Sequence, residues 1–303
     1  MRIGIVLPIA EEDGETDIPS YSLIRAMAVG AEAAGFDSIW VYDHLLFRFD
    51  GRTTGIHECW TILSAIAEAT KRVELGTLVM CAGFRNAALL AKMAATLDHV
   101  SGGRFTLGVG AGWHDAEYEA FGYPTDHKVS RFEESLAVIT SLIREGQVTL
   151  DGRYVTARDA VLRPRARPDL PILVAAEGPR MLELTARHAD AWNLAWFGLP
   201  DERLARVRGE LTEACERVGR DPATLGITVG ITVRYPELAF GTTDAEASTS
   251  PALSGTPDEI AAGLAAHAAA GANHLIAALE PATPATLTVF AQAVARYRAA
   301  AAH

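Results

Sequence analysis

Two patterns of hydrophobic residues alternate along the whole chain. Short, continuous apolar runs are typical of strands covered on both faces, and segments with apolar residues every three or four positions are typical of amphipathic helices. We predict strands at residues 2–7, 37–42, 73–80, 105–110, 172–176, 191–196, 227–233 and 274–279. A helical pattern follows each of these strands.

Eight strand–helix units in 303 residues predict an α/β fold, a (β/α)8 TIM barrel that forms a single domain over residues 1–303. A doubly wound open sheet is the alternative. It does not need eight repeats, and the first predicted strand is not followed by the glycine-rich phosphate loop typical of that fold. The pattern therefore favours the closed barrel.

Local signals place several helix starts and two departures from the alternation. Ser20 and Asn86 are predicted N-caps, and 130–133 and 256–259 have the capping-box pattern. Residues 147–171 interrupt the repeat between the fourth helix and the fifth strand, and we expect a hairpin-like insertion there. Residues 237–255 are polar and without periodicity, so we expect a mobile surface loop.

Composition narrows the possible partners. The net charge of −11 argues against nucleic acid as a partner. The sequence contains no run of 18 apolar residues, so it predicts no membrane span. The acidic start is unlike a signal peptide, and the three cysteines fit a reducing compartment. We therefore expect a cytoplasmic protein whose partner is a small molecule.

Glycines occupy every second position at the end of the fourth predicted strand. Because alternate side chains of a strand point to the same side, Gly108, Gly110 and Gly112 leave one side bare. Either another backbone or a flat ligand is expected to cross there. The segment is not the dinucleotide fingerprint, because Trp113 stands where the third glycine would be.

The carboxyl ends of the strands, where barrels carry their active sites, are rich in aromatic and small residues. They lack the paired carboxylates of a glycosidase, a cluster with metal-ligand spacing and a Ser-His-Asp arrangement. A mostly apolar cavity with a glycine floor suits a flat redox cofactor that brings its own chemistry.

Six segments resemble the luciferase-like monooxygenase superfamily, in order and over almost the whole chain. They are WVYDH (40–44), LGTLV (75–79), ALLAKMAATLD (88–98), SGGRFTLGVGAGWHDAEYEAFG (101–122), AAEGPRMLELTARHADAWN (175–193) and GTPDEIAAGLAAHAAAGANHLI (255–276). Within the superfamily the pattern is similar to the branch that uses the deazaflavin F420.

The resemblance implies an F420-dependent oxidoreductase that transfers a hydride between the deazaflavin and a small organic substrate. Members that use FMN share most of these motifs, so an FMN-dependent monooxygenase supplied by a partner flavin reductase is the alternative. A non-catalytic barrel that binds a flavin, or none, is a third reading. Barrels of this kind often pair, and we expect a homodimer.

The resemblance also implies a catalytic residue, His44, oriented by Asp43, although His44 could instead be a structural histidine bonded to Asp43. A non-proline cis peptide is implied at Leu78-Val79, against the face of the cofactor ring. The segment 175–180 is implied to bind phosphate at a helix N-terminus, where free N–H groups favour an anion. The cofactor-binding set is Asp43, His44, Leu78, Val79, Cys81, Gly110, Ala111, Gly112, Ala175, Ala176, Glu177, Gly178, Pro179 and Arg180.

Three expectations concern the substrate side and the charge near the cofactor. Members that oxidise glucose 6-phosphate have a glutamate at the position of Trp113, which argues against that substrate. Glu177 places a negative charge beside the predicted anion site and would weaken it unless its side chain turns away. His114 is a candidate proton donor. The predicted substrate set is Phe47, Trp113, His114, Trp196 and Arg234.

Overall fold

The computed structural model describes residues 1–11, 18–49, 51–238 and 250–301. Its main sheet closes on itself, because the first strand of the order β10-β11-β12-β13-β1-β2-β5-β7-β6 also pairs with β7. Apart from the two-residue β6, the members of this nine-stranded sheet are eight parallel barrel strands. They are β1 (Arg2–Val6), β2 (Ser38–Val41), β5 (Glu74–Thr77), β7 (Phe105–Gly110), β10 (Ile172–Ala175), β11 (Ala191–Phe197), β12 (Gly226–Arg234) and β13 (His274–Glu280).

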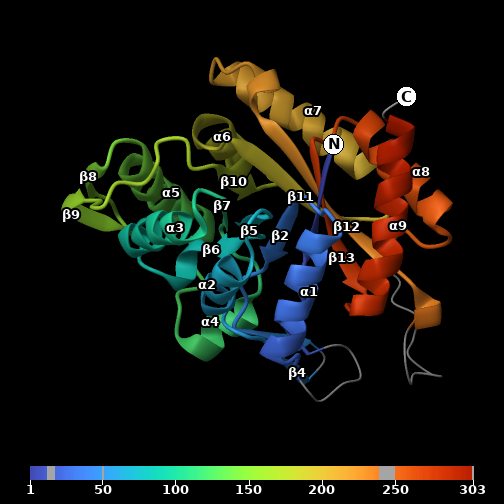
Figure 1. Cartoon of the computed structure of the whole chain (residues 1–303). Coiled ribbons are helices and arrows are strands. Elements are labelled where there is room, and N and C mark those ends of the chain that lie inside the picture. The colour runs from blue at the N-terminus through green and yellow to red at the C-terminus, as the bar shows by residue number, and fades with distance from the viewer. Residues whose placement is uncertain (12–17, 50, 239–249, 302–303) are drawn as a thin grey trace.

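Helices surround the barrel (Figure 1). They are α1 (Tyr21–Ala33), α2 (Cys59–Ala69), α3 (Ala87–Ser101), α4 (Asp115–Phe121), α5 (Lys128–Arg144), α6 (Pro179–His188), α7 (Glu202–Arg217), α8 (Pro257–Ala269) and α9 (Pro284–Ala301), with 3-10 turns η1 (Ala82–Phe84), η2 (Pro222–Thr224) and η3 (Pro236–Leu238). The predicted (β/α)8 barrel is confirmed. None of the helices in the described ranges combines the length and the apolar character needed to cross a bilayer.

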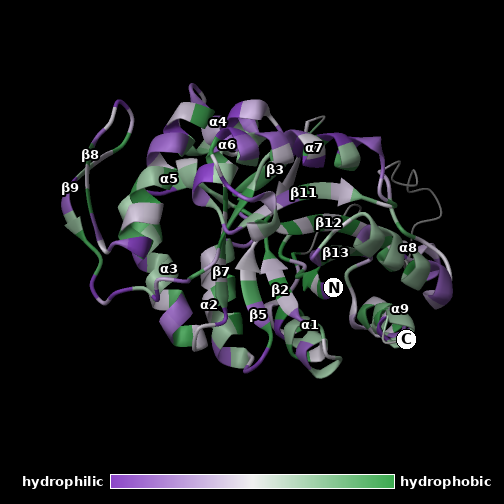
Figure 2. Cartoon of the chain, turned by 90° about the horizontal axis from the view of Figure 1, so that it is seen from above, coloured by the Kyte–Doolittle hydropathy of each residue, from purple (hydrophilic) through white to green (hydrophobic). Residues whose placement is uncertain are grey.

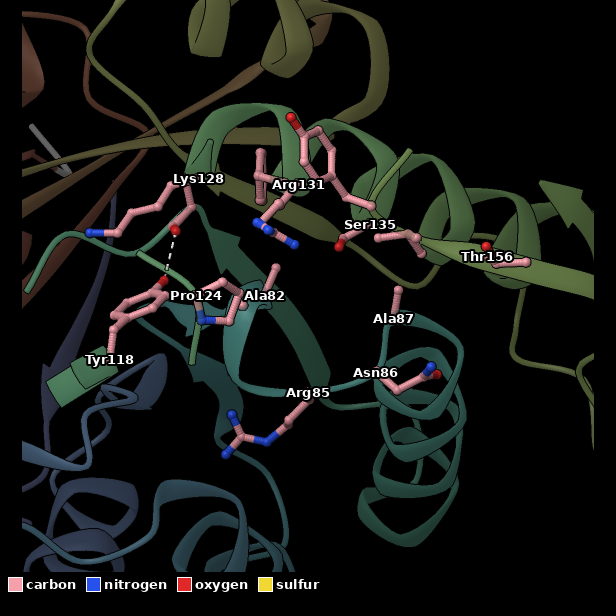
Figure 3. Close-up of a pocket in the computed structure, with 15 residues that line it drawn as sticks. Ala82, Arg85, Asn86, Ala87, Tyr118, Pro124, Lys128, Arg131, Ser135 and Thr156 are labelled. Carbon is pink, nitrogen blue, oxygen red and sulfur yellow. Dashed lines mark hydrogen bonds between the residues drawn. The ribbon is translucent and has the colours of Figure 1, made fainter. Parts of the chain in front are cut away.

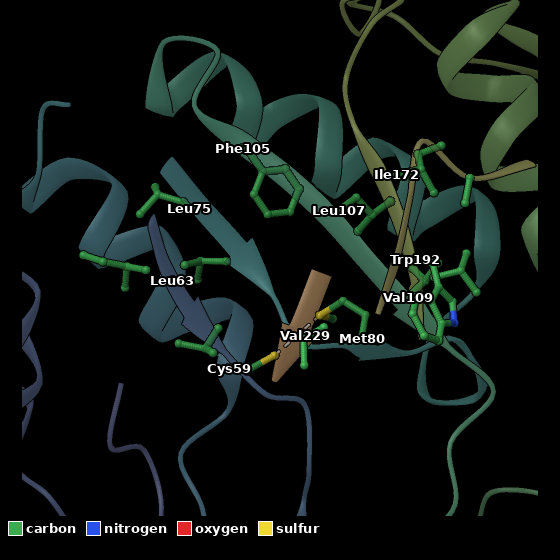
Figure 4. Packing of buried hydrophobic residues seen from close by; sticks show 14 of the residues in the cluster. Cys59, Leu63, Leu75, Met80, Phe105, Leu107, Val109, Ile172, Trp192 and Val229 are labelled. Carbon is green, nitrogen blue, oxygen red and sulfur yellow. Dashed lines mark hydrogen bonds between the residues drawn. The ribbon is translucent and has the colours of Figure 1, made fainter. Parts of the chain in front are cut away.

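The main core lies between the strands and the helices, as expected when each parallel strand is covered on its outer face. Leu63 of α2 belongs to the same buried cluster as Leu75 of β5 and Phe105 of β7 (Figure 4). A smaller cluster inside the barrel contains Trp40 and Ile276. The interior therefore contains packed side chains, as in other barrels of this kind.

Two short hairpins decorate the barrel. The antiparallel pair β8 (Gln147–Asp151) and β9 (Thr156–Val161) forms the insertion predicted at 147–171 and projects beside α5 (Figure 2). A second hairpin, β3 (Leu46–Phe49) and β4 (Arg52–Gly55), follows β2 directly and was not predicted. Its strands are too short to show a clear hydrophobic period.

Three of the four predicted helix starts are confirmed, and one is wrong. Ser20 and Asn86 cap α1 and α3 through their side chains, and the capping box at Thr256 is present. The capping box predicted at 130–133 is wrong, because α5 begins earlier, at Lys128 after His127. Ser130 lies inside the helix, where its hydroxyl accepts a hydrogen bond from Arg180.

The predicted loop 237–255 is ordered at both described flanks. Residues 239–249 lie outside the described part of the chain. On one side of them is η3, and on the other Leu253 exchanges backbone hydrogen bonds with Thr232 and Arg234 of β12. The second flank is therefore an extension of the barrel edge, not free loop.

Candidate active site

The bare side of the glycine run is occupied by the end of the third barrel strand. A Cβ on Gly108 would lie 1.9 Å from the carbonyl oxygen of Thr77, and one on Gly110 would lie 2.8 Å from Cγ2 of Val79. Of the two explanations left open by the sequence, close approach of another backbone is correct for Gly108. The glycines let the Thr77–Val79 segment pack against β7 at the barrel mouth.

The predicted strand 73–80 breaks at this point into β5 and β6 (Met80–Cys81). The Leu78–Val79 peptide bond is cis, as the resemblance implied, and a second non-proline cis bond joins Ala195 to Trp196. The Val79 side chain is partly buried and packs against Leu78 and its neighbours. Val79 therefore offers an apolar surface next to Gly110.

Asp43 has a different role from the one predicted. Its buried carboxylate accepts hydrogen bonds from the guanidinium of Arg85 at 2.6 and 3.1 Å and from the backbone N–H of Cys81 at 2.9 Å. The thiol of Cys59 also donates to it. Asp43 thus ties β2 to β6 and α2, and the expectation that it orients His44 is wrong.

His44 is held by Glu117 of α4, a residue that sequence reasoning missed. The Nδ1 atom of His44 lies 2.8 Å from Oε1 of Glu117, and the backbone N–H of Leu45 donates to Oε2 at 2.8 Å. The Glu117 side chain is only 2% exposed. An ionised carboxylate accepts and cannot donate, so Nδ1 carries the proton in this pair.

His44 follows the carboxyl end of β2, where the barrel mouth lies, and its other ring nitrogen is accessible. Nε2 has no hydrogen-bond partner within the described ranges and does not belong to their buried, unpaired polar atoms. With Nδ1 protonated, neutral His44 presents a free lone pair at Nε2. The pair formed by His44 and Glu117 can therefore accept a proton from a hydroxyl group and return it.

Two other predicted residues are buried and hydrogen-bonded within the protein. His114 is buried, and its Nε2 accepts a hydrogen bond from the backbone N–H of Arg48 at 3.0 Å. Nε2 therefore carries no proton in this pair, and the His114 ring anchors the β3–β4 hairpin. That His114 donates a proton stays a prediction. Cys81 is buried beside the Tyr118 hydroxyl at 2.8 Å, and burial raises the pKa of its thiol to about 11. Cys81 is therefore not a reactive thiol at neutral pH.

The predicted phosphate turn begins helix α6. No side chain caps this start, and a Cβ on Gly178 would meet no atom within 4 Å, so the helix start faces open space. Arg180 contacts Glu133 of α5 and lies beside the turn. A helix start with free N–H groups is favourable for an anion.

Glu177 does turn away from this helix start. Both of its carboxylate oxygens accept hydrogen bonds from Arg203 of α7, at 3.0 and 2.8 Å, and Arg206 lies 3.5 Å away. The hydrogen bonds from Arg203 hold the pKa of Glu177 below its ordinary value. The negative charge that would have opposed phosphate is thus paired within the protein.

The remaining predicted substrate residues divide into two groups. Phe47 and Trp113 lie beside His44, with ring centroids 4.4 and 5.5 Å from the imidazole. Arg234 lies at the end of β12, where its Nε donates to Glu280 at 2.7 Å. Trp196, at the end of β11, is 40% exposed. We find no contact that joins Trp196 or Arg234 to His44 among the described residues.

A cavity of about 200 Å³ lies between η1, α5 and the turn after β8. Lys128 and Arg131 line it, and Arg85 extends away from them (Figure 3). Lys128 contacts Asp115, and Arg131 pairs with Asp126. Because these charges are already paired, the cavity is not a strong anion site.

The fold and the site together define a class of protein. It is a (β/α)8 barrel whose mouth carries a histidine–carboxylate pair and an apolar wall backed by glycine. Comparison with known proteins then identifies the family. Residues 1–247 match the luciferase-like monooxygenase family, and the chain belongs to it.

Relatives and solved structures agree with this assignment. A phthiodiolone/phenolphthiodiolone dimycocerosates ketoreductase from Mycobacterium sp. (strain JLS) is 35% identical over 74% of this chain and 62% of its own length. An F420-dependent glucose-6-phosphate dehydrogenase from Beutenbergia cavernae is 37% identical over 60% of this chain and 53% of its own length. The matched region thus spans less than two thirds of either relative.

The fold is similar to that of an F420-dependent secondary alcohol dehydrogenase in complex with an F420–acetone adduct. Its TM-score is 0.80 at 20% identity, with 98% of each chain covered. The coenzyme F420-dependent tetrahydromethanopterin reductase from Methanopyrus kandleri has a TM-score of 0.77 at 18% identity, over 98% of this chain and 99% of its own. These likenesses show the fold.

Proposed function

We propose that the protein is an F420-dependent oxidoreductase that interconverts an alcohol and a carbonyl compound. The observation that carries the proposal is the His44–Glu117 pair, with its accessible Nε2 at the barrel mouth. Relatives and structural neighbours named as F420-dependent enzymes support the choice of cofactor.

The residues at the mouth fit a deazaflavin with a phosphate-bearing side chain. Val79 offers an apolar wall beside Gly110, and the uncapped start of α6 offers N–H groups to an anion. Arg203 pairs with Glu177, the carboxylate that directly precedes that start. When bound, F420 would supply the acceptor or donor of a hydride.

The protein's own part is to position the substrate and move one proton. In the oxidising direction, Nε2 of His44 accepts the proton of the substrate hydroxyl, while the carbon that bears this hydroxyl gives up a hydride. In the reducing direction, His44 starts protonated and donates from Nε2 to the carbonyl oxygen. The buried Glu117 carboxylate stabilises the imidazolium in both directions.

Titration of the purified protein with F420 tests the proposal, because binding inside the barrel should quench the cofactor's fluorescence. Binding should also raise the melting temperature, since a ligand of the native state stabilises it. Reduced FMN is the comparison ligand. Absence of quenching at tens of micromolar F420, together with stabilisation by reduced FMN, would replace this proposal with a flavin-dependent monooxygenase.

The His44→Ala variant separates binding from chemistry. It should still quench F420 fluorescence, because other residues form the wall and the anion site, but its turnover with a panel of alcohols should fall by about a hundredfold or more. We also propose a homodimer, which sedimentation velocity would test.

A further inference from the structure

Three aromatic rings form a cluster beside His44 at the barrel mouth, and each ring is about equally far from the other two. We call Phe47, Phe49 and Trp113 the aromatic ladder. The planes of Phe49 and Trp113 differ by 16°, those of Phe47 and Phe49 by 25° and those of Phe47 and Trp113 by 29°, with centroids 6.0 to 6.5 Å apart. The ladder therefore presents broad, nearly parallel faces.

The ladder is exposed although it is firmly held. Trp113 is 60% exposed and Phe49 is 52% exposed. The β3 side of the hairpin is fixed, since the N–H of Arg48 donates to His114 and the N–H of Leu45 donates to Glu117. Solvent-exposed aromatic rings that are held in a fixed arrangement indicate a binding surface.

The charges of the hairpin disfavour a cationic ligand. Arg52 of β4 lies opposite Phe49 in the antiparallel register, so a positive residue is on the same face of the hairpin as Phe49. Residues alternate along a strand, so Phe47 and Phe49 share one face of β3 and Arg48 points to the other, where its Nε donates to Thr53. None of the cation–π contacts within the described ranges involves the ladder. Parallel rings also differ from the box of crossed rings that encloses a cation.

We propose that the aromatic ladder binds an uncharged aromatic group of the substrate and so selects aryl ketones and aryl alcohols. This inference rests on the proposed function for the chemical step. A planar ring stacked on Trp113 lies beside His44, whose ring centroid is 4.4 Å from that of Phe47 and 5.5 Å from that of Trp113. An adjoining carbonyl or hydroxyl group can then reach Nε2.

Ligand binding tests the ladder without requiring turnover. Acetophenone, acetone and tetramethylammonium are the probes, and saturation-transfer NMR on the F420-loaded protein gives their dissociation constants. Acetophenone should bind at least about tenfold more tightly than acetone, since ring stacking adds about 0.5–1.5 kcal/mol to the burial of the ring. Tetramethylammonium should not compete with acetophenone.

The double variant Phe49→Ala/Trp113→Ala should abolish the preference for acetophenone and leave acetone binding unchanged. Phe121→Ala is the matched control, because Phe121 is 53% exposed on α4 and has no ring contact with the ladder. A wild-type protein without the preference, a preference that survives the double variant, or competition by tetramethylammonium would each overturn the inference.

The same experiment keeps the two proposals apart. If F420 fails to quench but acetophenone still binds the free protein through the ladder, the cofactor assignment fails and the aromatic site stands. If F420 binds and the ladder variants bind both ketones as the wild type does, the cofactor assignment stands and the aromatic site is wrong. Circular dichroism and F420 binding of the variants exclude misfolding as the cause.

Discussion

The Glu117→Gln substitution probes the arrangement on which the proposed proton transfer depends. Glu117 accepts two hydrogen bonds of 2.8 Å, one from Nδ1 of His44 and one from the backbone N–H of Leu45. A glutamine of the same shape has one acceptor oxygen and one donor NH₂ group. It can satisfy one of these partners, and its NH₂ group must face the other.

The backbone N–H of Leu45 cannot change its role, but the imidazole can. We therefore expect the glutamine oxygen to face Leu45 and its NH₂ group to face His44. Nδ1 then becomes the acceptor and Nε2 carries the proton, so the neutral ring presents no lone pair to a substrate hydroxyl. General base catalysis contributes about 10²- to 10⁴-fold to a rate.

The expected result is a fall in kcat for alcohol oxidation of at least about a hundredfold, equivalent to about 2.7 kcal/mol of activation free energy. Stopped-flow absorbance of F420 measures kcat, and ¹⁵N NMR of the His44 ring reports the tautomer directly. The dissociation constant of F420 should not change. Glu119→Gln, an exposed change on the same helix, should leave kcat and tautomer unaffected.

Two outcomes would refute this reasoning. If Glu117→Gln retains kcat within about threefold of the wild type while the tautomer shifts, His44 is not the proton acceptor. If the tautomer does not shift, Glu117 does not set it. Glu117→Ala should also lower the free energy of unfolding by about 3 kcal/mol, because two donors lose their acceptor.

Three further predictions concern stability and the charge near the cofactor. Gly108→Ala should lower the free energy of unfolding in urea by about 2 kcal/mol or more, because the new Cβ would lie 1.9 Å from the carbonyl oxygen of Thr77. Gly178→Ala is the control, because a Cβ there would meet no atom, and it should cost less than about 1 kcal/mol. Equal losses in the two variants would contradict the close packing at Gly108. Burial lowers the pKa of His274 to about 3, so between pH 6.5 and 3 the unfolded state binds one proton more than the folded state. The free energy of unfolding should therefore fall with falling pH in this range, by up to about 1.4 kcal/mol per pH unit. His274→Gln should lose this slope, and a variant with an unchanged slope would contradict the prediction. Arg203→Ala should weaken F420 binding several-fold, because Glu177 would keep only the more distant Arg206 as a partner for its charge. Adding Glu177→Gln should restore the affinity measured by fluorescence. Failure of the second change to restore it would show that Arg203 acts in another way.

The hydrophobic pattern by itself determined the barrel. Strand and helix periods are local properties, and the parallel strands, covered on both faces, show them without help from distant residues. The caps at Ser20, Asn86 and Thr256 were equally predictable, because each involves residues three positions apart. The resemblance added the position of the cis peptide at Leu78-Val79.

Only the tertiary structure decided which side chains form the site. Asp43 and His44 are neighbours in sequence, which favoured a pair, but their side chains bind Arg85 and Glu117, which are 42 and 73 positions away. The only sequence signal for Glu117 was a carboxylate on the apolar face of a short predicted helix, which is an unusual place for a charge. The pairing of Glu177 with Arg203 and the stacking of Phe49 on Trp113 depend in the same way on distances that no local period encodes. A sequence pattern specifies which face of an element is buried, whereas the partner of a buried charge is set by how separate elements pack.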